Sequence, residues 1–334
     1  MTDANNIIGI KECIRLLHEA THIVLTTHLN PDGDAIGSES ALFGALKNAG
    51  KDVRIINCDA APENLGFLNE DGNVELYNPA LHDSVIASAD LLVAMDLNDI
   101  KRVRQMEAPF RSSTARKLVI DHHLEPKAFA DFYCSIPELS STSEIVHDIL
   151  EVDQTVLTYP IALGLYVGIM TDTGSFRFDR TTARVHRIAA RLLEAGVDPT
   201  MIHRLIFDEY PMGRTRLLGM ILAGIEQYCE GKVTILVVSK EMFVETGTTV
   251  EDVENIVNSG LSIRGVEVTA LLTEFTDQIK ISFRSRGQFS VNNIAGIFGG
   301  GGHRLAAGVT VVGVPLGELK ESIAAALCAA VADK

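Results

Sequence analysis

The chain has 334 residues, 46% of them hydrophobic and 22% charged, and this length and composition predict an ordinary globular protein of two domains. Its net charge of −15 and its 6% of aromatic residues, with no Trp, argue against a basic groove or stacking platform for long nucleic acid. No apolar run approaches the roughly 20 residues of a membrane helix, and the polar N-terminus does not resemble a signal peptide, so we expect a cytoplasmic protein with no membrane partner.

The first part of the sequence alternates helix and strand signals. Short apolar runs predict strands at 22–25, 53–56, 91–95 and 117–120. Helix patterns, with capping and stop signals, cover about 7–20, 35–50, 141–150, 160–170 and 182–194. This alternation predicts an α/β fold, a doubly wound and mainly parallel sheet, over residues 1–195.

The pattern changes in the second part of the sequence. Residues 196–230 are expected to form a helical linker, and strands are predicted at 233–238, 266–272 and 278–283. A glycine-rich turn and an alanine-rich helix at 316–331 follow. We therefore predict a second, smaller α/β domain over 231–334, with the active-site cleft between the two domains.

The cysteines carry no pairing signal. There are five, Cys13, Cys58, Cys134, Cys229 and Cys328, and they are scattered with no CxxC pair. Buried free thiols are therefore expected, rather than a disulfide framework or a zinc knuckle.

The loop after the first predicted strand concentrates potential metal ligands. Pro31 and Gly33 forbid a continuous helix there, which leaves His28, Asp32 and Asp34 on a loop between strand and helix. In an open α/β sheet, ligand sites lie beyond the carboxyl ends of the strands. Three such side chains in one short loop favour a metal site over packing.

Polar side chains also follow later apolar segments. Asp96 and the triplet Asp121-His122-His123 each directly follow a predicted strand, and Asp172 follows an apolar helix. Alone, each aspartate is most simply a turn former or a helix cap. Because the carboxyl ends of parallel strands meet at one edge, we expect these side chains to gather with the first loop.

Carboxylates gathered at one edge need compensating charge, since like charges raise one another's pKa and destabilise the fold. Asp32, Asp34, Asp96 and Asp172 supply four negative charges, which two divalent ions would balance. Carboxylate and imidazole ligands without thiolate favour Mn²⁺ or Mg²⁺ over a structural zinc. Two ions about 3.5–4 Å apart form an arrangement used for phosphoester hydrolysis, so a two-metal site is predicted.

A second cluster lies in the glycine-rich stretch 298–308. It lacks the Gly-Lys-Ser/Thr of a nucleoside-triphosphate loop and the βαβ context of a dinucleotide-binding turn. Successive glycines can turn backbone N–H groups toward an anion, and Arg284, His303 and Arg304 add donors suited to phosphate. From this stretch alone, a flexible turn is an equally good interpretation.

Together these motifs resemble the DHH phosphoesterase family. The residues that match its metal-domain motifs are His28-x-x-x-Asp32-x-Asp34, Asp96, Asp121-His122-His123 and Asp172. The stretch 298–308 resembles the signature of the DHH-associated C-terminal domain, so the likeness covers nearly the whole chain. It implies a metal-dependent phosphoric ester hydrolase similar to the short members that act on oligoribonucleotides and on 3′-phosphoadenosine 5′-phosphate (pAp).

The resemblance also implies roles for single residues. His28 and Asp32 would hold one Mn²⁺ ion (Mg²⁺ being the alternative), Asp34, His122 and Asp172 a second, and Asp96 would bridge both. Asp121 and His123 would be the catalytic, proton-handling residues beside an activated hydroxide. The implied substrate-binding residues are Arg284, Gly300, Gly301, Gly302, His303 and Arg304.

Alternative functions stay open at this point. The resemblance also covers phosphodiesterases for cyclic dinucleotides or linear pNpN, and a non-catalytic nucleotide sensor would keep the same fold. The intact ligand set argues against a sensor, and the glycine-rich stretch argues against an inorganic pyrophosphatase. The expected partners are short RNA or a small nucleotide, no long duplex, and a second copy of the chain, because similar proteins are homodimers.

Overall fold

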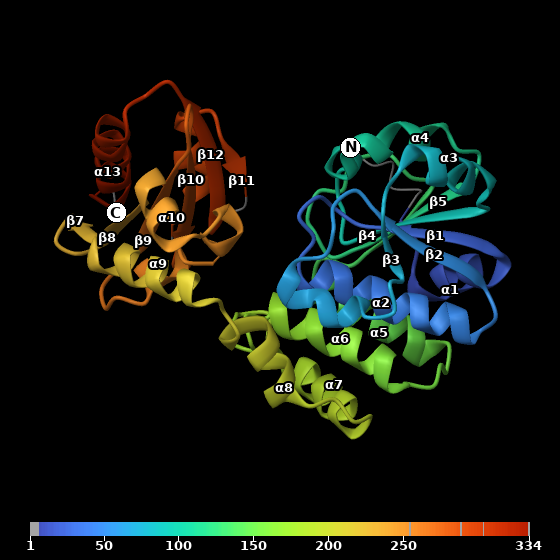
Figure 1. Cartoon of the computed structure of the whole chain (residues 1–334). Helices are drawn as coiled ribbons and strands as arrows, with labels where there is room; N and C mark the ends of the chain where they lie inside the picture. The colour runs from blue at the N-terminus through green and yellow to red at the C-terminus, as the bar shows by residue number, and fades with distance from the viewer. Residues whose placement is uncertain (1–6, 254, 288, 303, 333–334) are drawn as a thin grey trace. The chain divides into compact units, whose positions relative to one another are not determined.

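The computed structural model describes residues 7–332 except 254, 288 and 303. The chain divides into two compact units, Met1–Glu209 and Tyr210–Lys334, and each is built on one six-stranded sheet (Figure 1). Among the described residues, no helix combines the length and the apolar character needed to span a bilayer.

The first unit contains the predicted doubly wound sheet, and all its strand pairs are parallel. Its strands are β1 (His22–Thr26), β2 (Asp52–Asn57), β3 (Val74–Leu76), β4 (Leu91–Met95), β5 (Arg116–Asp121) and β6 (Phe132–Ser135). They lie in the order β3-β2-β1-β4-β5-β6. Strands β2 and β3 are added on one side of β1, and β4, β5 and β6 on the other, so the strand order reverses between β1 and β4. Such a reversal is where ligands bind in open α/β sheets.

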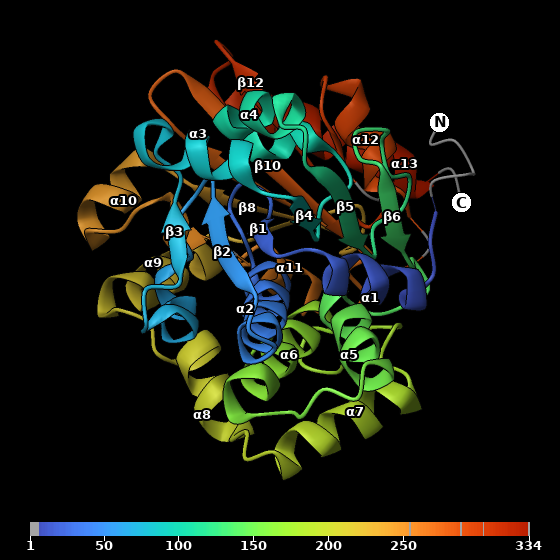
Figure 2. The same cartoon turned by 90° about the vertical axis from the view of Figure 1, so that its right-hand side faces the viewer.

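Helices cover both faces of this sheet (Figure 2). They are α1 (Ile10–Glu19), α2 (Gly33–Asn48), α3 (Pro79–Ser88), α4 (Glu107–Ser112), α5 (Thr142–Val152), α6 (Tyr159–Asp172), α7 (Ala183–Glu194) and α8 (Pro199–His203), with the shorter turns η2 (Glu63–Asn69), η3 (Ile100–Met106) and η4 (Arg204–Asp208). Successive strand residues serve opposite faces: Ile23 and Leu25 join the core under α1, α2, α5 and α6, while Val24 joins the core under α3 and α4.

Helices α2 and α6 cross at backbone contact. A Cβ atom on Gly37 of α2 would lie 2.4 Å from the carbonyl oxygen of Gly164 on α6, and one on Gly164 would lie 2.6 Å from that of Gly37. Residues Ile161–Met170 of α6 are all buried, so this helix is held on every side. Asp34 begins α2 and Asp172 ends α6, which makes the crossing part of the support for both side chains.

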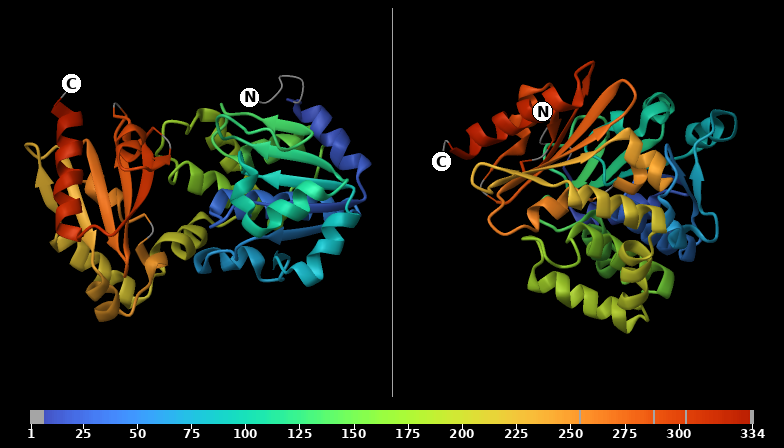
Figure 3. Two further views of the ribbon diagram at one scale, coloured as in Figure 1. Left: turned by 90° about the horizontal axis from the view of Figure 1, so that it is seen from above. Right: turned by 60° about the vertical axis from the view of Figure 1, so that its left-hand side comes forward.

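The second unit has a mixed sheet in the order β11-β12-β10-β9-β8-β7, with β8 and β9 parallel and the other pairs antiparallel. Its strands are β7 (Glu226–Tyr228), β8 (Val233–Val238), β9 (Val268–Glu274), β10 (Gln278–Ser285), β11 (Gly301–Gly302) and β12 (Ala306–Val312). Its helices are α9 (Met212–Ala223), α10 (Lys240–Thr246), α11 (Asn258–Leu261), α12 (Val291–Ile297) and α13 (Leu316–Ala332), with the turn η5 (Val250–Val253). Helix α13, red in Figure 3, packs along one face of the sheet through Leu319, Ile323 and Leu327.

The expectation of free thiols is wrong for two of the five cysteines. Cys229, after β7, and Cys328, on α13, form a disulfide with their Cα atoms 5.7 Å apart. Cys13, Cys58 and Cys134 are buried free thiols, as predicted. The paired cysteines are 99 residues apart in the chain. Their contact forms only when the second unit folds, so local sequence spacing could not predict it.

Reduction of this disulfide is expected to lower the free energy of unfolding of the second unit by about 2–4 kcal/mol, because the bond closes a long loop in the unfolded chain. Urea denaturation with and without dithiothreitol, together with a thiol count, measures the effect. The Cys328→Ser variant is the control, since its stability should not respond to reductant. Equal stability of the unsubstituted protein under both conditions would contradict the prediction.

Candidate metal centre

The predicted ligands come from strand ends that meet at one edge of the first sheet. His28 follows β1, Asp96 follows β4, and Asp121 is the last residue of β5, ahead of His122 and His123. Strand β4 pairs with both β1 and β5, so the three ends are neighbours. They lie where the strand order reverses, and the structure therefore brings these side chains to the place that a doubly wound sheet offers a ligand.

Two helix ends complete the set. Asp32 is the N-cap of α2, and its side chain accepts hydrogen bonds from the backbone N–H groups of Asp34 and Ala35 at 3.0 and 3.1 Å. Asp34 is the second residue of α2, and Asp172 is the last residue of α6. The Asp-x-Asp spacing thus places one carboxylate on the cap and one inside the helix, which turns them toward different neighbours.

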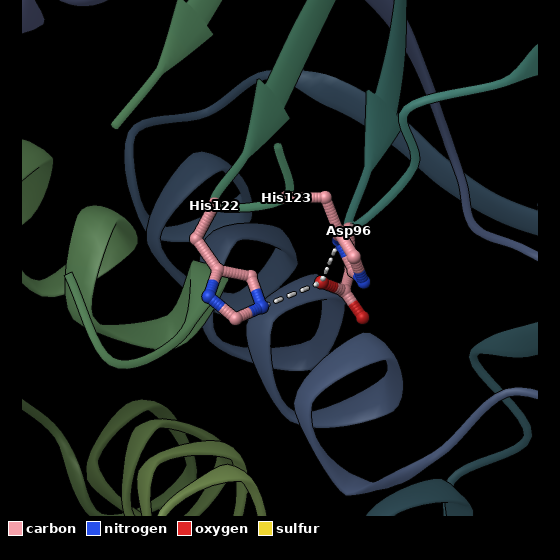
Figure 4. Close-up of side chains that lie close together, drawn as sticks. All are labelled: Asp96, His122 and His123. Carbon is pink, nitrogen blue, oxygen red and sulfur yellow. Dashed lines mark ion pairs between the residues drawn. The ribbon is translucent and has the colours of Figure 1, made fainter. Parts of the chain in front are cut away.

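Among the described residues, four groups of side chains lie close enough to share a cation: one, His147, Asp148 and Glu151, lies on α5, and the other three lie at this edge of the sheet. The ligand atoms within each group are within 4.8 Å of one another, and the three groups at the edge are His28, Asp32 and Asp96; Asp34, His122 and Asp172; and Asp96, His122 and His123. The third group joins the other two, because it shares Asp96 with the first and His122 with the second. Figure 4 shows His122 and His123 approaching the same oxygen of Asp96, with distances of 3.6 and 3.5 Å.

The donor set fits a hard divalent cation. Asp96 faces His28 through Oδ2, 3.3 Å from Nε2, and His122 through Oδ1. His122 Nε2 also lies 3.2 Å from Asp172 Oδ2. Burial lowers the pKa of His122, which favours the neutral imidazole that a metal ligand requires. Carboxylate oxygens and imidazole nitrogens without sulfur are ligands of Mn²⁺ and Mg²⁺.

The electrostatics of the cluster favour a cation as well. Burial raises the pKa values of Asp34 and Asp172 well above the usual carboxyl range, and neighbouring carboxylates add to the effect. Burial also opposes ionisation of Asp96, but its hydrogen bond to His28 and the charges of the histidines hold its pKa below the usual range. Charges buried this deeply destabilise the fold unless a counter-charge is present.

Asp121 and His123 form a pair beside these groups. Asp121 is fully buried, and its Oδ1 lies 2.7 Å from His123 Nδ1. Burial alone would lower the pKa of His123, yet the hydrogen bond to Asp121 and the charge of Asp96 raise it to about 9. Asp121 therefore orients the imidazole and keeps it protonated.

The N-terminus of α5 contributes contacts that the sequence did not reveal. The backbone N–H groups of Thr142 and Ser143 donate to the two oxygens of Asp34 at 2.6 and 2.9 Å, and the Thr142 hydroxyl donates to Asp96 at 3.0 Å. Ser141 caps the same helix. The capping spacing predicted where this helix begins, but no signal in the chain said which carboxylate its first turn would meet.

A second buried network supports the strand ends. Asn57 at the end of β2 donates to Glu39 Oε2 at 2.8 Å and accepts from the Thr27 N–H at 3.1 Å. The Thr27 hydroxyl donates to the carbonyl oxygen of Met95 at 2.9 Å. Thr27 precedes His28 and Met95 precedes Asp96, so the network ties two ligand-bearing turns to α2.

The stability of the metal-free protein is expected to fall with rising pH because of Glu39. Burial raises the pKa of Glu39 from 4.5 to about 8, against the hydrogen bond from Asn57. The folded protein then holds this proton more tightly than the unfolded chain does, so the free energy of unfolding declines from about pH 4.5 and the loss is complete above about pH 8. Thermal unfolding in EDTA measures the slope. Glu39→Gln keeps the acceptor without the charge and should reduce the slope, leaving the part that Asp34 and Asp172 contribute. An equal slope in both proteins would contradict this assignment.

The predicted substrate residues that the structure describes lie on or between neighbouring strands of the second unit. Gly301 and Gly302 form β11, which pairs with Gly308 and Ala307 of β12, and β12 pairs in turn with β10, which carries Arg284. A Cβ atom on Gly300 would lie 2.3 Å from the carbonyl oxygen of Gly308. Gly301 and Gly302 are therefore paired with β12, and Gly300 is a glycine because the backbone of β12 comes too close for a side chain.

The other predicted substrate residues are Arg284, Arg304 and His303. The Arg284 guanidinium donates to the Phe283 carbonyl oxygen at 2.9 Å, and burial lowers its pKa. Arg304 is exposed between β11 and β12. His303 lies outside the described residues.

The fold and the ligand set define a class of phosphoester hydrolases. Residues 22–169 match the family model described as the DHH family, N-terminal domain, and residues 230–333 match the DHHA1 domain. A Thermus thermophilus protein called "Bifunctional oligoribonuclease and PAP phosphatase NrnA" is 33% identical over 90% of this chain and 87% of its own length. The Bacillus subtilis protein of that name is 26% identical over 90% and 92%.

Solved structures agree with this placement. An exopolyphosphatase-related protein from Bacteroides fragilis superposes with a TM-score of 0.89 at 33% identity, over 94% of this chain and 95% of that one. RecJ from Thermus thermophilus shares the fold, with a TM-score of 0.58 at 16% identity over 98% of this chain and 55% of that one. The chain belongs to the DHH family and is a phosphoric ester hydrolase, as its motifs predict.

Proposed function

We propose that this chain is a Mn²⁺-dependent phosphoesterase that hydrolyses short oligoribonucleotides to mononucleotides and pAp to AMP. The observation that carries the proposal is the pair of ligand groups, His28, Asp32 and Asp96 beside Asp34, His122 and Asp172, joined by the contact between Asp96 and His122. The relatives named as oligoribonuclease and PAP phosphatase, which match along most of the chain, support these substrates.

The two groups would each hold one divalent cation, with Asp96 contributing to both through its two oxygens. Mn²⁺ is proposed, with Mg²⁺ as the alternative, because the donors are oxygen and imidazole nitrogen. When bound, such ions activate water and offset the negative charge that develops on the phosphoryl oxygens.

The residues around these groups have separate tasks. The N–H groups of Thr142 and Ser143 hold the carboxylate of Asp34, and the Thr142 hydroxyl holds that of Asp96. His123, whose Nδ1 lies 2.7 Å from Asp121, would give a proton from Nε2 to the leaving oxygen. In the second unit, Arg284, Arg304, His303 and the N–H groups of Gly300–Gly302 would bind the remaining phosphate or the terminal nucleotide.

A substrate panel tests the proposal. The protein is incubated with Mn²⁺ and, separately, with pAp, a short RNA, cyclic di-AMP or pyrophosphate, with EDTA as the control. We expect AMP from pAp and mononucleotides from RNA. Cleavage of cyclic di-AMP alone would favour the dinucleotide phosphodiesterase, loss of pyrophosphate alone would contradict the proposed substrate class, and no turnover at all would favour a nucleotide sensor. The homodimer and the cytoplasmic location stay predictions.

A further inference from the structure

Arg180 stands directly against one of the candidate metal ligands. It lies in the segment that joins α6 to α7, and its Nη1 is 3.5 Å from His122 Nδ1 and donates to the carbonyl oxygen of Leu139 at 3.2 Å. The other ring nitrogen of His122, Nε2, faces Asp172 and Asp96. Arg180 therefore approaches the second ligand group from behind the imidazole, and its side chain is only partly exposed.

Arg180 forms no ion pair with a carboxylate of the described residues. Among the ion pairs of the described residues, none joins its guanidinium to Asp or Glu, whereas Arg184 one turn later pairs with both Glu144 and Asp148. Among the described residues, the guanidinium therefore has the Leu139 carbonyl oxygen as an acceptor but no carboxylate, which leaves donors available for an anion from outside the chain.

Loading of the site changes what Arg180 can contact. A neutral imidazole that binds a cation through Nε2 carries its proton on Nδ1. The guanidinium has donors only, so Nη1 of Arg180 and Nδ1 of His122 would then present hydrogens to each other. The contact at 3.5 Å is already at the outer limit of a hydrogen bond. With a cation held at Nε2, His122 would offer no acceptor to Arg180, and the guanidinium would be available to another group.

We propose that Arg180 binds the phosphoryl group of the substrate beside the second ligand group. A phosphate oxygen is the acceptor that a guanidinium fits best, and this partly exposed side chain lies beside His122, which belongs to that ligand group. An arginine of the first unit would thus bind the reacting phosphate, in addition to the proposed phosphate-binding donors of the second unit. This inference rests on the proposed function for the identity of the reacting group.

The test uses inorganic phosphate, a product of pAp hydrolysis, as the probe. Its affinity for the Mn²⁺-loaded protein is measured by calorimetry for the unsubstituted chain, for Arg180→Gln, and for Arg187→Ala, an exposed arginine on α7 that serves as the control. The Mn²⁺ affinity and the melting temperature are measured on the same proteins. We expect Arg180→Gln to weaken phosphate binding about tenfold or more, with Mn²⁺ affinity changed less than about threefold. Arg187→Ala should match the unsubstituted chain.

Two outcomes would overturn the inference. Unchanged phosphate affinity in Arg180→Gln would show that the guanidinium does not bind the anion. A loss of Mn²⁺ affinity as large as the loss of phosphate affinity would make Arg180 a positioning residue for His122 instead. The substrate panel distinguishes a failure of this inference from a failure of the proposed function. If the unsubstituted chain turns over neither pAp nor RNA yet binds phosphate through Arg180, the proposed function fails and the inference holds.

Discussion

Replacement of Asp96 by Ala is expected to abolish Mn²⁺-dependent turnover, with a loss of about three orders of magnitude or more in kcat, while the protein stays folded. Asp96 directs Oδ2 toward His28 and Oδ1 toward His122, and so would contribute to both proposed cation positions. Its removal takes one negative charge from a buried cluster in which Asp34 and Asp172 already resist ionisation. The variant should therefore lose cation affinity rather than its structure.

Steady-state hydrolysis of pAp and thermal unfolding with and without Mn²⁺ measure both parts of this result. Asp131→Asn is a matched control, because Asp131 accepts a hydrogen bond from the N–H of Lys117 near the start of β5, at the end opposite the site. Mn²⁺ should raise the melting temperature of the unsubstituted chain and of this control, but not of Asp96→Ala. More than about a tenth of the activity remaining in Asp96→Ala would rule out the shared role of this carboxylate.

The strand ends were predictable because parallel strands impose a simple geometry. Short apolar runs marked β1, β4 and β5, and the first polar residues after each run had to meet at one edge. Strands β3 and β6 gave no such signal, since each is short and lies at an edge of the sheet. The chain order of His28, Asp96 and His122 thus carried most of the information about the site.

The hydrogen bonds that hold these side chains in place could not be predicted from the sequence. Thr142 and Ser143 reach Asp34 from more than a hundred residues away, and Glu39 meets Asn57 only after α2 has packed on the sheet. Hydrogen bonds of this kind depend on where the end of a helix or strand lies in the folded domain. Residue type and spacing gave Ser141 a local capping role but named no distant partner.

Replacement of Gly164 by Ala is expected to lower the free energy of unfolding by about 2–3 kcal/mol and to reduce turnover, although Gly164 touches no proposed ligand. Its added Cβ would meet backbone on α2, with the Gly37 oxygen at 2.6 Å and the Ala41 nitrogen at 3.1 Å. Backbone cannot rotate away as a side chain can, so the helices must separate. A separation of α2 from α6 moves Asp34 away from Asp172 and weakens the ligand group that they form with His122.

Urea denaturation and the Mn²⁺ dependence of pAp hydrolysis measure the two effects together. Gly66→Ala is the control, because nothing lies within 4 Å of a Cβ at that position of η2. It should leave both quantities close to their original values, since η2 contains no proposed ligand. In Gly164→Ala, the Mn²⁺ concentration for half-maximal activity should rise, because two ligands of one cation sit on the two helices that move. A variant that lost stability without any change in that concentration would show that the crossing supports the fold alone, and that Asp34 and Asp172 are held by their other contacts.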